Sequence, residues 1–230
     1  MPPIGPYWHP RDNTISLCRE PGDQASVRER VPSADRYPDA ARRGRCCIMM
    51  SVQLEVVAAD ALDHGARREI IGLCELAYGE DFSWLFDDLP GSVHVLARNG
   101  RGVLVAHAEW VTRWLQPAGH PRLRTAYVEA VATAPEHQKK GLATAVLHGL
   151  REVLVEQSTW ELGALSPSAP AFYARLGWEL WRGPLGIRRD GCIDATSADA
   201  QVMILRLPRT PSALVTTSLL TAEWRRGEVW

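Results

Sequence analysis

Residues 128–144 read VEAVATAPEHQKKGLAT, a strand-like run followed by a loop and the start of a helix. The first amides of a helix have no partner within it and together carry about half a positive charge. Gly141 permits close backbone approach, so several N–H groups of the loop can converge on one anion. This arrangement is suited to a pyrophosphate. The alternative interpretation is a surface turn that carries two solvated lysines.

Lysine is confined to this loop. Lys139 and Lys140 are the only two lysines of the chain, and all other Lys/Arg positions are arginine. The loop is not a Walker motif, because the chain has no Gly-x-x-x-x-Gly-Lys-Ser/Thr run.

Hydrophobic periodicity predicts strands and helices from residue 51 to the C-terminus. Asn99-Gly100 is a hairpin signal between two of the strands, and Asp60 is the predicted N-cap of the first helix. The expected strands are 52–57, 93–97, 103–111, a segment through 127–131, 160–165, 178–181 and 202–207; the expected helices are 60–77, 138–155 and a shorter one ending at 177. This order predicts a single α/β domain with a mostly antiparallel sheet.

Residues 1–50 lack this periodicity. They contain seven of the sixteen prolines, eight arginines and six acids, with few large aliphatic residues. Such a segment cannot bury enough apolar surface to offset its ordering entropy. We therefore predict an extension over 1–50, disordered or preceding a working start at Met49 or Met50, and one domain over 51–230. An organelle transit peptide is disfavoured by the acids, and a secretory signal by the missing apolar run.

The composition is that of an ordinary globular protein, with 46% hydrophobic and 23% charged residues. A net charge of −1 indicates no bulk attraction to nucleic acid or to an anionic membrane. No apolar run approaches the roughly 18 residues of a membrane-spanning helix. The five cysteines are scattered without a CxxC pair, so neither a disulfide framework nor a zinc cluster is expected. The sequence therefore favours a cytoplasmic location and predicts no metal site.

Several segments resemble a known family. QKKGLA at 138–143 matches the Gln/Arg-x-x-Gly-x-Gly/Ala signature of the Gcn5-related N-acetyltransferases (GNAT), and AFYARLGW at 171–178 is similar to their second mark. The chain more specifically resembles the aminoglycoside 2'-N-acetyltransferases. The segments that carry this resemblance are GEDFS at 79–83, YVEAVA at 127–132, LGALS at 162–166 and the terminal EWRRGEVW at 223–230.

The resemblance implies a fold and a cofactor. The expected fold is a mixed, mostly antiparallel sheet with a central splayed parallel strand pair flanked by helices. The expected cofactor is acetyl-CoA, whose pantetheine arm would pair with backbone groups of Val131 and Thr133. Its pyrophosphate would be bound by the loop and first helical turn, formed by Gln138, Lys139, Lys140, Gly141, Leu142, Ala143 and Thr144.

The resemblance also implies catalytic roles. Glu129 would draw a proton from the substrate amine through water, and Tyr173 would act as the general acid near the sulfur. A base needs suitable reach and a pKa near the working pH. The alternatives are a solvated edge-strand glutamate for Glu129 and a tyrosine packed against the core for Tyr173.

Carboxylates are expected to hold a polycationic substrate through charge-assisted hydrogen bonds. By resemblance, these are Asp81, Glu228 and the main-chain carboxylate of Trp230, with Ser166 lining the sugar pocket. A further acid of the 190–200 loop, Asp194 or Asp199, would join them; for Asp199 a solvated surface position is the alternative. Departures from the family pattern at Phe86 and near Pro167 leave the preferred drug open, including kasugamycin.

The predicted function is transfer of an acetyl group from acetyl-CoA to the 2' amine of an aminoglycoside, which would confer antibiotic resistance. One alternative keeps the cofactor but changes the acceptor to a polyamine, an amino sugar or an antibiotic precursor. Another is a CoA-binding or regulatory module without turnover. The resemblance also implies a homodimer.

Overall fold

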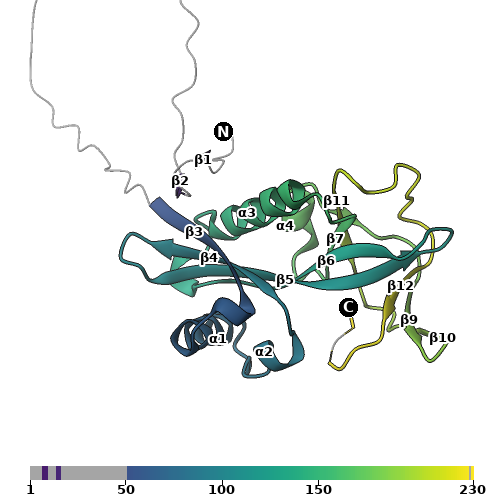
Figure 1. Cartoon of the computed structure of the whole chain (residues 1–230), viewed down its shortest axis with the longest axis horizontal. Helices are drawn as coiled ribbons and strands as arrows, with labels where there is room; N and C mark the ends of the chain where they lie inside the picture. Colours follow the sequence, from purple (N-terminus) through teal and green to yellow (C-terminus); the bar gives the residue numbers. More distant parts are fainter. Residues whose placement is uncertain (1–6, 10–13, 17–50, 228) are drawn as a thin grey trace, which may run out of the picture.

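The computed structural model describes residues 7–9, 14–16, 51–227 and 229–230. The main sheet has the strand order β1-β2-β3-β4-β5-β6-β7-β11-β8, and β6 and β7 are parallel while the other neighbours are antiparallel (Figure 1). Its strands are β1 (Tyr7–His9), β2 (Thr14–Ser16), β3 (Ser51–Ala58), β4 (Val93–Asn99), β5 (Leu104–Pro117), β6 (Leu123–Thr133), β7 (Leu162–Leu165), β8 (Glu179–Leu180) and β11 (Met203–Arg206). The predicted fold, with its central parallel pair, is confirmed.

A second group of strands extends one end of the long β5–β6 hairpin. It contains β9 (Leu185–Arg189), β10 (Cys192–Ala195) and β12 (Leu220–Glu223). β12 pairs antiparallel with the end of β5, where Leu220 lies opposite Pro117, and parallel with β9. The sequence predicted none of these three strands, because their short runs lack a clear apolar alternation. β12 brings the C-terminal segment back to the centre of the fold.

Helices cover both faces of the sheet. α1 (His64–Tyr78) and α2 (Leu85–Asp88) lie on one face, and α3 (Leu142–Gln157) and α4 (Pro170–Ala174) lie on the other (Figure 1). Adjacent sheet residues alternate between two cores: Leu96 packs on the α1 side, while Val95 and Ala97 pack on the α3 side. This follows from the two-residue period of a strand. Short 3-10 turns occupy Ala59–Ala61 and Pro135–His137.

Two helix starts differ from the sequence prediction. The first helix is capped by Asp63 and not by Asp60, because the Asp63 carboxylate accepts a hydrogen bond from the Ala66 amide at 2.7 Å. Asp60 lies in the preceding 3-10 turn. The second predicted helix begins at Leu142 and not at residue 138, since Gly141 adopts a left-handed conformation (φ 84°) that no helix interior contains.

The remaining predicted elements agree in place but differ in length, and α2 was not predicted. α4 spans Pro170–Ala174 and ends before residue 177, where the predicted helix ended. It starts at Pro170, which fits only the first turn of a helix, and the chain turns away at Gly177, whose φ of 86° is left-handed. Within the predicted extension the structure describes β1 and β2, and β2 pairs with β3; the remaining residues of 1–50 lie outside the described part, so the prediction for them stays open. Of the helices described, none combines the length and the apolar character that a membrane crossing demands.

Candidate functional site

A β-bulge shapes the middle of β6. Glu129 pairs with Glu109 of β5, the next pair is Ala132 with His107, and the bulged residue Ala130 has a left-handed φ of 48°. A bulge bends its strand and increases the local twist. β6 pairs with β7 only from Thr125 to Tyr127, so the parallel pair separates just before Glu129. The splay that the family resemblance implied therefore lies at the predicted base.

Glu129 lines a pocket of about 520 Å³ beside the splay. Its side chain is 17% exposed, and its carboxylate forms an ion pair with Arg225 at 2.6 Å. A cation at this distance favours the ionised form of a carboxylate. The pocket is lined by residues of α1, of the loop between α1 and α2, of β6 and of the segment after β12: Tyr78, Phe82, Trp84, Glu129, Arg225 and Arg226.

Tyr78 connects the pocket to the bulge. Its hydroxyl donates a hydrogen bond to the Val131 carbonyl at 3.0 Å. Burial raises the pKa of Tyr78, and charges on Tyr173 and Glu129 act in the same direction. Sequence reasoning missed this residue, since a tyrosine at the end of an amphipathic helix has no distinguishing local pattern.

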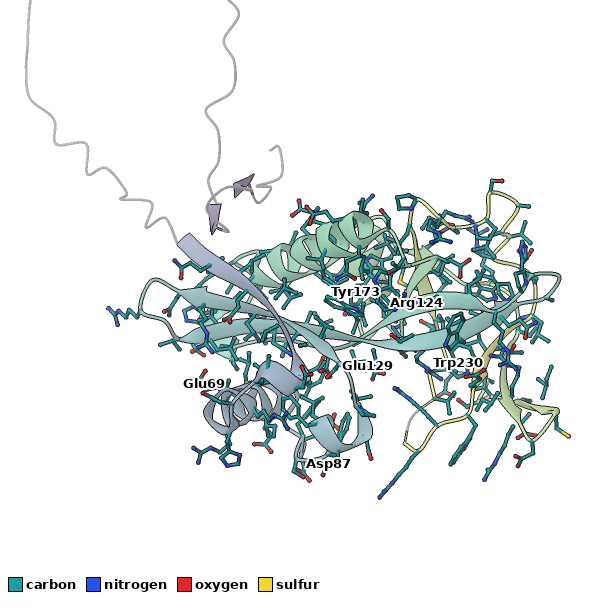
Figure 2. All side chains as sticks on the ribbon, in the orientation of Figure 1. Glu69, Asp87, Arg124, Glu129, Tyr173 and Trp230 are labelled. Atoms are coloured by element: carbon teal, nitrogen blue, oxygen red, sulfur yellow. The ribbon has the colours of Figure 1, made fainter. Side chains whose placement is uncertain are left out.

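Tyr173 lies on α4 with its side chain largely buried (Figure 2). Its ring contacts Phe172 and Trp178 edge-on, with ring centroids 5.1 and 6.2 Å away. Burial raises the pKa of Tyr173 above its ordinary value, and a hydrogen bond with Ser168 partly opposes the shift. The hydroxyl therefore retains its proton at neutral pH, as a general acid must.

Glu109 faces Glu129 across the strand pair but is fully buried. Burial raises the pKa of Glu109 to about 8, and the charge of Glu129 adds to the shift, while Ser92 and Arg225 oppose it. The two glutamates thus occupy opposite environments: one is paired with an arginine at the pocket, and the other is enclosed. Sequence reasoning did not single out Glu109.

The predicted phosphate loop is exposed and ends at the N-terminus of α3. Lys139 (φ 59°) and Gly141 are both left-handed, a combination that turns the backbone sharply before the first helical turn. No side chain caps the helix, in which Leu142 is buried and Ala143 and Thr144 are half-buried. The loop is braced from within, because Lys140 Nζ donates to the Glu136 carbonyl at 2.6 Å and Gln138 Nε2 to the Thr133 carbonyl at 3.4 Å.

The C-terminal segment runs between two pockets. The second pocket, about 480 Å³, is lined by Ser166, Asp199 and Trp230, and Gly227 borders both pockets. Three of the predicted substrate residues, far apart in sequence, therefore meet in space. Glu228 lies outside the described residues. In the described part of the chain Asp81 lines neither pocket; its carboxylate accepts hydrogen bonds from the amide and hydroxyl of Ser83, at 2.8 and 3.0 Å.

Arg113 anchors the C-terminal segment, which starts at Glu223, from its buried side. Its guanidinium donates to the Val229 carbonyl and, at 2.9 Å, to the Glu223 carbonyl, and it stacks over Tyr127 at 4.8 Å. Burial lowers the pKa of Arg113 to about 10. The sequence carried a signal for this role: strand alternation places Arg113 on the same face as Val111 and Leu115, which are buried.

We predict that Arg113→Met destabilises the protein by about 2–3 kcal/mol, because two buried carbonyls lose a charged donor. Urea denaturation measures the difference. Arg122→Met is the matched control, since Arg122 is exposed and its ion pair with Glu223 should contribute little. A change below about 0.5 kcal/mol for Arg113→Met, the range of ordinary surface substitutions, would contradict the anchoring role.

Comparisons with known proteins identify the family and the fold. A family model described as an acetyltransferase (GNAT) domain matches residues 76–181. An aminoglycoside 2'-N-acetyltransferase from Mycolicibacterium fortuitum is 35% identical over 170 residues, which cover 72% of this chain and 84% of that protein. The crystal structure of the GNAT family N-acetyltransferase YhbS from Escherichia coli, in complex with CoA, matches with a TM-score of 0.53 and 16% identity over 81% of this chain and 93% of that one.

Proposed function

This chain belongs to the aminoglycoside 2'-N-acetyltransferases of the GNAT superfamily, and from that membership we propose that it acetylates the 2' amine of an aminoglycoside with acetyl-CoA. That it is an acetyltransferase follows from the family itself. The choice of acceptor is supported by the 35% identical relative, and the observation that supports the chemistry is the position of Glu129, in a pocket at the point where β6 and β7 separate.

The loop and strand suit acetyl-CoA. Backbone amides around Gly141 and at the start of α3 would bind the pyrophosphate, with the positive end of the helix dipole behind them. Lys139 adds a positive charge at the exposed rim. Backbone groups of β6 near Val131 and Thr133 would hold the pantetheine arm. Once bound, acetyl-CoA supplies the acetyl group as a thioester.

Two side chains would carry out the two proton transfers, Glu129 as the base and Tyr173 as the acid. Glu129 takes a proton from the substrate amine through a water molecule, as the nitrogen forms its bond to the acetyl carbon. Arg225 keeps Glu129 ionised before the amine arrives. Tyr173 gives its hydroxyl proton to the sulfur as the carbon–sulfur bond breaks. The enzyme then returns to its starting state when Glu129 loses its proton and Tyr173 regains one from solvent.

The acceptor would be held by acids beside the C-terminus. Asp199, Ser166 and the chain end at Trp230 surround one pocket, and Glu228 comes from the same segment. Fixed carboxylates and ammonium groups form strong charge-assisted hydrogen bonds. Asp81 would join them only if an ammonium group of the substrate replaces the Ser83 amide and hydroxyl as hydrogen-bond donors to its carboxylate. Arg225 and Arg226 line the other pocket, the one that contains Glu129, and their positive charges would repel a polycation there. They therefore favour an acceptor whose ammonium groups lie away from both arginines.

Mass spectrometry of the reaction products tests this proposal. The full chain, with acetyl-CoA, is given two aminoglycosides that differ only in carrying an amine or a hydroxyl at the 2' carbon. We expect one added acetyl group on the amine and none on the hydroxyl compound. Equal acetylation of both, or acetylation of a polyamine or amino sugar in place of either, would assign the activity to another amine. Kasugamycin belongs in the panel because it also offers a 2' amine.

Tyr173→Phe should lower kcat about 10²-fold, because the departing thiolate then lacks its proton donor. The effect has a defined pH dependence. The hydroxyl acts while protonated, and its pKa is raised, so the wild-type rate should fall only above the ordinary tyrosine pKa near 10. The variant should lack that alkaline fall. Phe172→Leu, a neighbour without a hydroxyl, is the control for packing. A variant that keeps the wild-type pH profile would exclude Tyr173 as the acid.

A further inference from the structure

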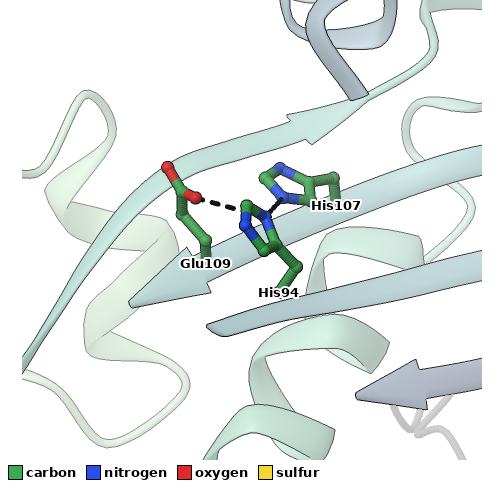
Figure 3. A group of neighbouring side chains, drawn as sticks. All are labelled: His94, His107 and Glu109. Atoms are coloured by element: carbon green, nitrogen blue, oxygen red, sulfur yellow. Dashed lines mark hydrogen bonds and ion pairs between the residues drawn. The ribbon is translucent and has the colours of Figure 1, made fainter. Parts of the chain in front are cut away.

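Three polar side chains meet inside the sheet, on the α1 side. His94 belongs to β4, and His107 and Glu109 belong to β5; all three are fully buried (Figure 3). His94 lies directly opposite Glu109 in the strand register, and His107 precedes Glu109 by two residues on the same face. The backbone pairing therefore forces the three side chains together. One potential ligand atom of each lies within 4.8 Å of the others.

Hydrogen bonds orient both imidazoles toward this centre. His107 Nδ1 lies 2.9 Å from the Ala130 carbonyl, which can only accept, so Nδ1 carries the proton and Nε2 presents its lone pair. His94 Nε2 lies 3.0 Å from the Ser92 hydroxyl, which can accept its proton and leave the lone pair on Nδ1. These outer partners are the kind that orient metal-bound histidines.

The carboxyl group of Glu109 has only weak partners. Among the described residues neither of its oxygens makes a hydrogen bond of normal geometry; His94 Nδ1 lies 3.2 Å from one oxygen, and the Ser92 hydroxyl, which His94 also contacts, is close enough to lower the pKa of Glu109. His94 Nδ1 also lies 3.0 Å from His107 Nε2. If His94 Nδ1 carries a proton, it can donate that proton fully to Glu109 or to His107, but not to both. A buried charge without compensation is strongly unfavourable. Either a proton on Glu109 or a cation at the centre of the cluster would remove the problem.

We propose that His94 Nδ1, His107 Nε2 and the Glu109 carboxylate bind one divalent transition-metal ion, with zinc as the ion that these donors favour. Two imidazoles and a carboxylate form a common zinc donor set, with a water molecule as fourth ligand. Tetrahedral zinc ligands at 2.0–2.2 Å lie about 3.3 Å apart. The separations of 3.0 and 3.2 Å at His94 are within a few tenths of an ångström of that value.

The neighbouring cysteine would not be a ligand. Cys74 Sγ lies 3.8 Å from His107 Nδ1, which is the outer nitrogen and faces away from the centre. Cysteine spacing, on which the sequence-based prediction of no metal site rested, therefore carries no information about this cluster. The site depends on two histidines and a glutamate that come together only through strand register.

The proposed ion would act through the bulge. A bound metal polarises the imidazole of His107 and strengthens its hydrogen bond to the Ala130 carbonyl. Ala130 follows Glu129 and holds the left-handed conformation that bends β6. The ion would thus stabilise the local backbone that positions the base, without contact with either substrate.

Metal analysis of the full-length chain tests the proposal. The protein is stripped with a chelator, supplied with zinc, and analysed by elemental mass spectrometry after removal of free ion. We expect about one zinc per chain, together with a rise in Tm. Cobalt substitution should produce the visible absorption of a tetrahedral site. Glu109→Gln keeps the shape of the side chain but replaces an anionic ligand with a neutral amide, and should weaken zinc binding at least about 100-fold, since loss of an outer partner of a ligand alone costs about 10- to 100-fold. His148→Gln, which removes an exposed histidine of α3, should bind zinc like the wild type.

The outcomes distinguish a cluster that binds a metal ion from one in which Glu109 carries a proton. If Glu109→Gln folds and binds as much zinc as the wild type, or if the wild type binds less than about a tenth of an equivalent, the cluster holds a proton and the proposal is wrong. His107→Gln removes a second proposed ligand and should also weaken zinc binding; should that variant fail to fold, the Glu109→Gln comparison still decides. The acetylation assay is read separately, so loss of the metal proposal leaves the proposed function intact.

Discussion

Replacing Glu129 with glutamine should lower kcat about 10²- to 10³-fold, while the KM for acetyl-CoA stays within about twofold. Glutamine preserves the size and hydrogen bonding of the side chain but cannot accept the proton that the attacking amine must lose. The fold should tolerate the change, since the side chain lies at a pocket wall and not in the core. Steady-state kinetics with saturating acetyl-CoA measures the effect.

Two controls sharpen this result. Glu80→Gln removes an acid from the same pocket without touching β6, and should change kcat little. Arg225→Met removes the ion-pair partner of Glu129 and tests whether that contact holds the carboxylate in place for the reaction. A Glu129→Gln enzyme that retains a third or more of the wild-type kcat would show that another group, or solvent alone, takes the proton.

Adding a single glycine after Trp230 should raise the KM for the aminoglycoside at least tenfold and leave the KM for acetyl-CoA unchanged. The extension converts the terminal carboxylate to a neutral amide and moves the new carboxylate by about one residue, 3.8 Å. A lost charge-assisted hydrogen bond of about 2 kcal/mol corresponds to such a change. The buried indole of Trp230 can keep its place, so stability should be preserved.

Deletion of Trp230 distinguishes the chain end from its side chain. Removing the indole, which packs in the core, should lower the free energy of unfolding by about 3 kcal/mol in addition to the loss of binding. The glycine extension should therefore weaken binding without lowering Tm, and the deletion should do both. Equal KM values for the extended and wild-type enzymes would mean that the terminal carboxylate does not bind the acceptor.

Local sequence predicted the strand–loop–helix segment around the 138–141 loop, apart from the residue at which the helix begins. The loop at 138–141, its glycine and the apolar stripe of the following helix are contiguous, and their conformations depend on neighbours within a few residues. The β5 hairpin followed from Asn99-Gly100 and from alternation. Motif resemblance added Glu129 and Tyr173, which no local pattern distinguishes from a solvated glutamate and a core tyrosine.

Boundaries and partners were harder to predict. Asp60 and Asp63 are both acceptable caps, and only Asp63 reaches an amide of the first turn. Arg113 lies beyond the predicted strand 103–111, so neither its buried position in β5 nor its hydrogen-bond partners were predicted. Arg225 pairs with a residue almost a hundred positions away, and that ion pair requires the C-terminal segment to return along β12.

The amino-acid sequence by itself determined the strand–loop–helix unit, the succession of elements and the family to which they belong, because these depend on short-range periodicity and turn chemistry. Only the tertiary structure decided which side chains meet: Glu129 with Arg225, Trp230 with Ser166 and Asp199, and His94 with Glu109 and His107. Strand register and the bulge at Ala130 determine which of the strand residues among them come into contact. Both are long-range properties, since a shift of one residue would turn every one of these strand side chains to the opposite face.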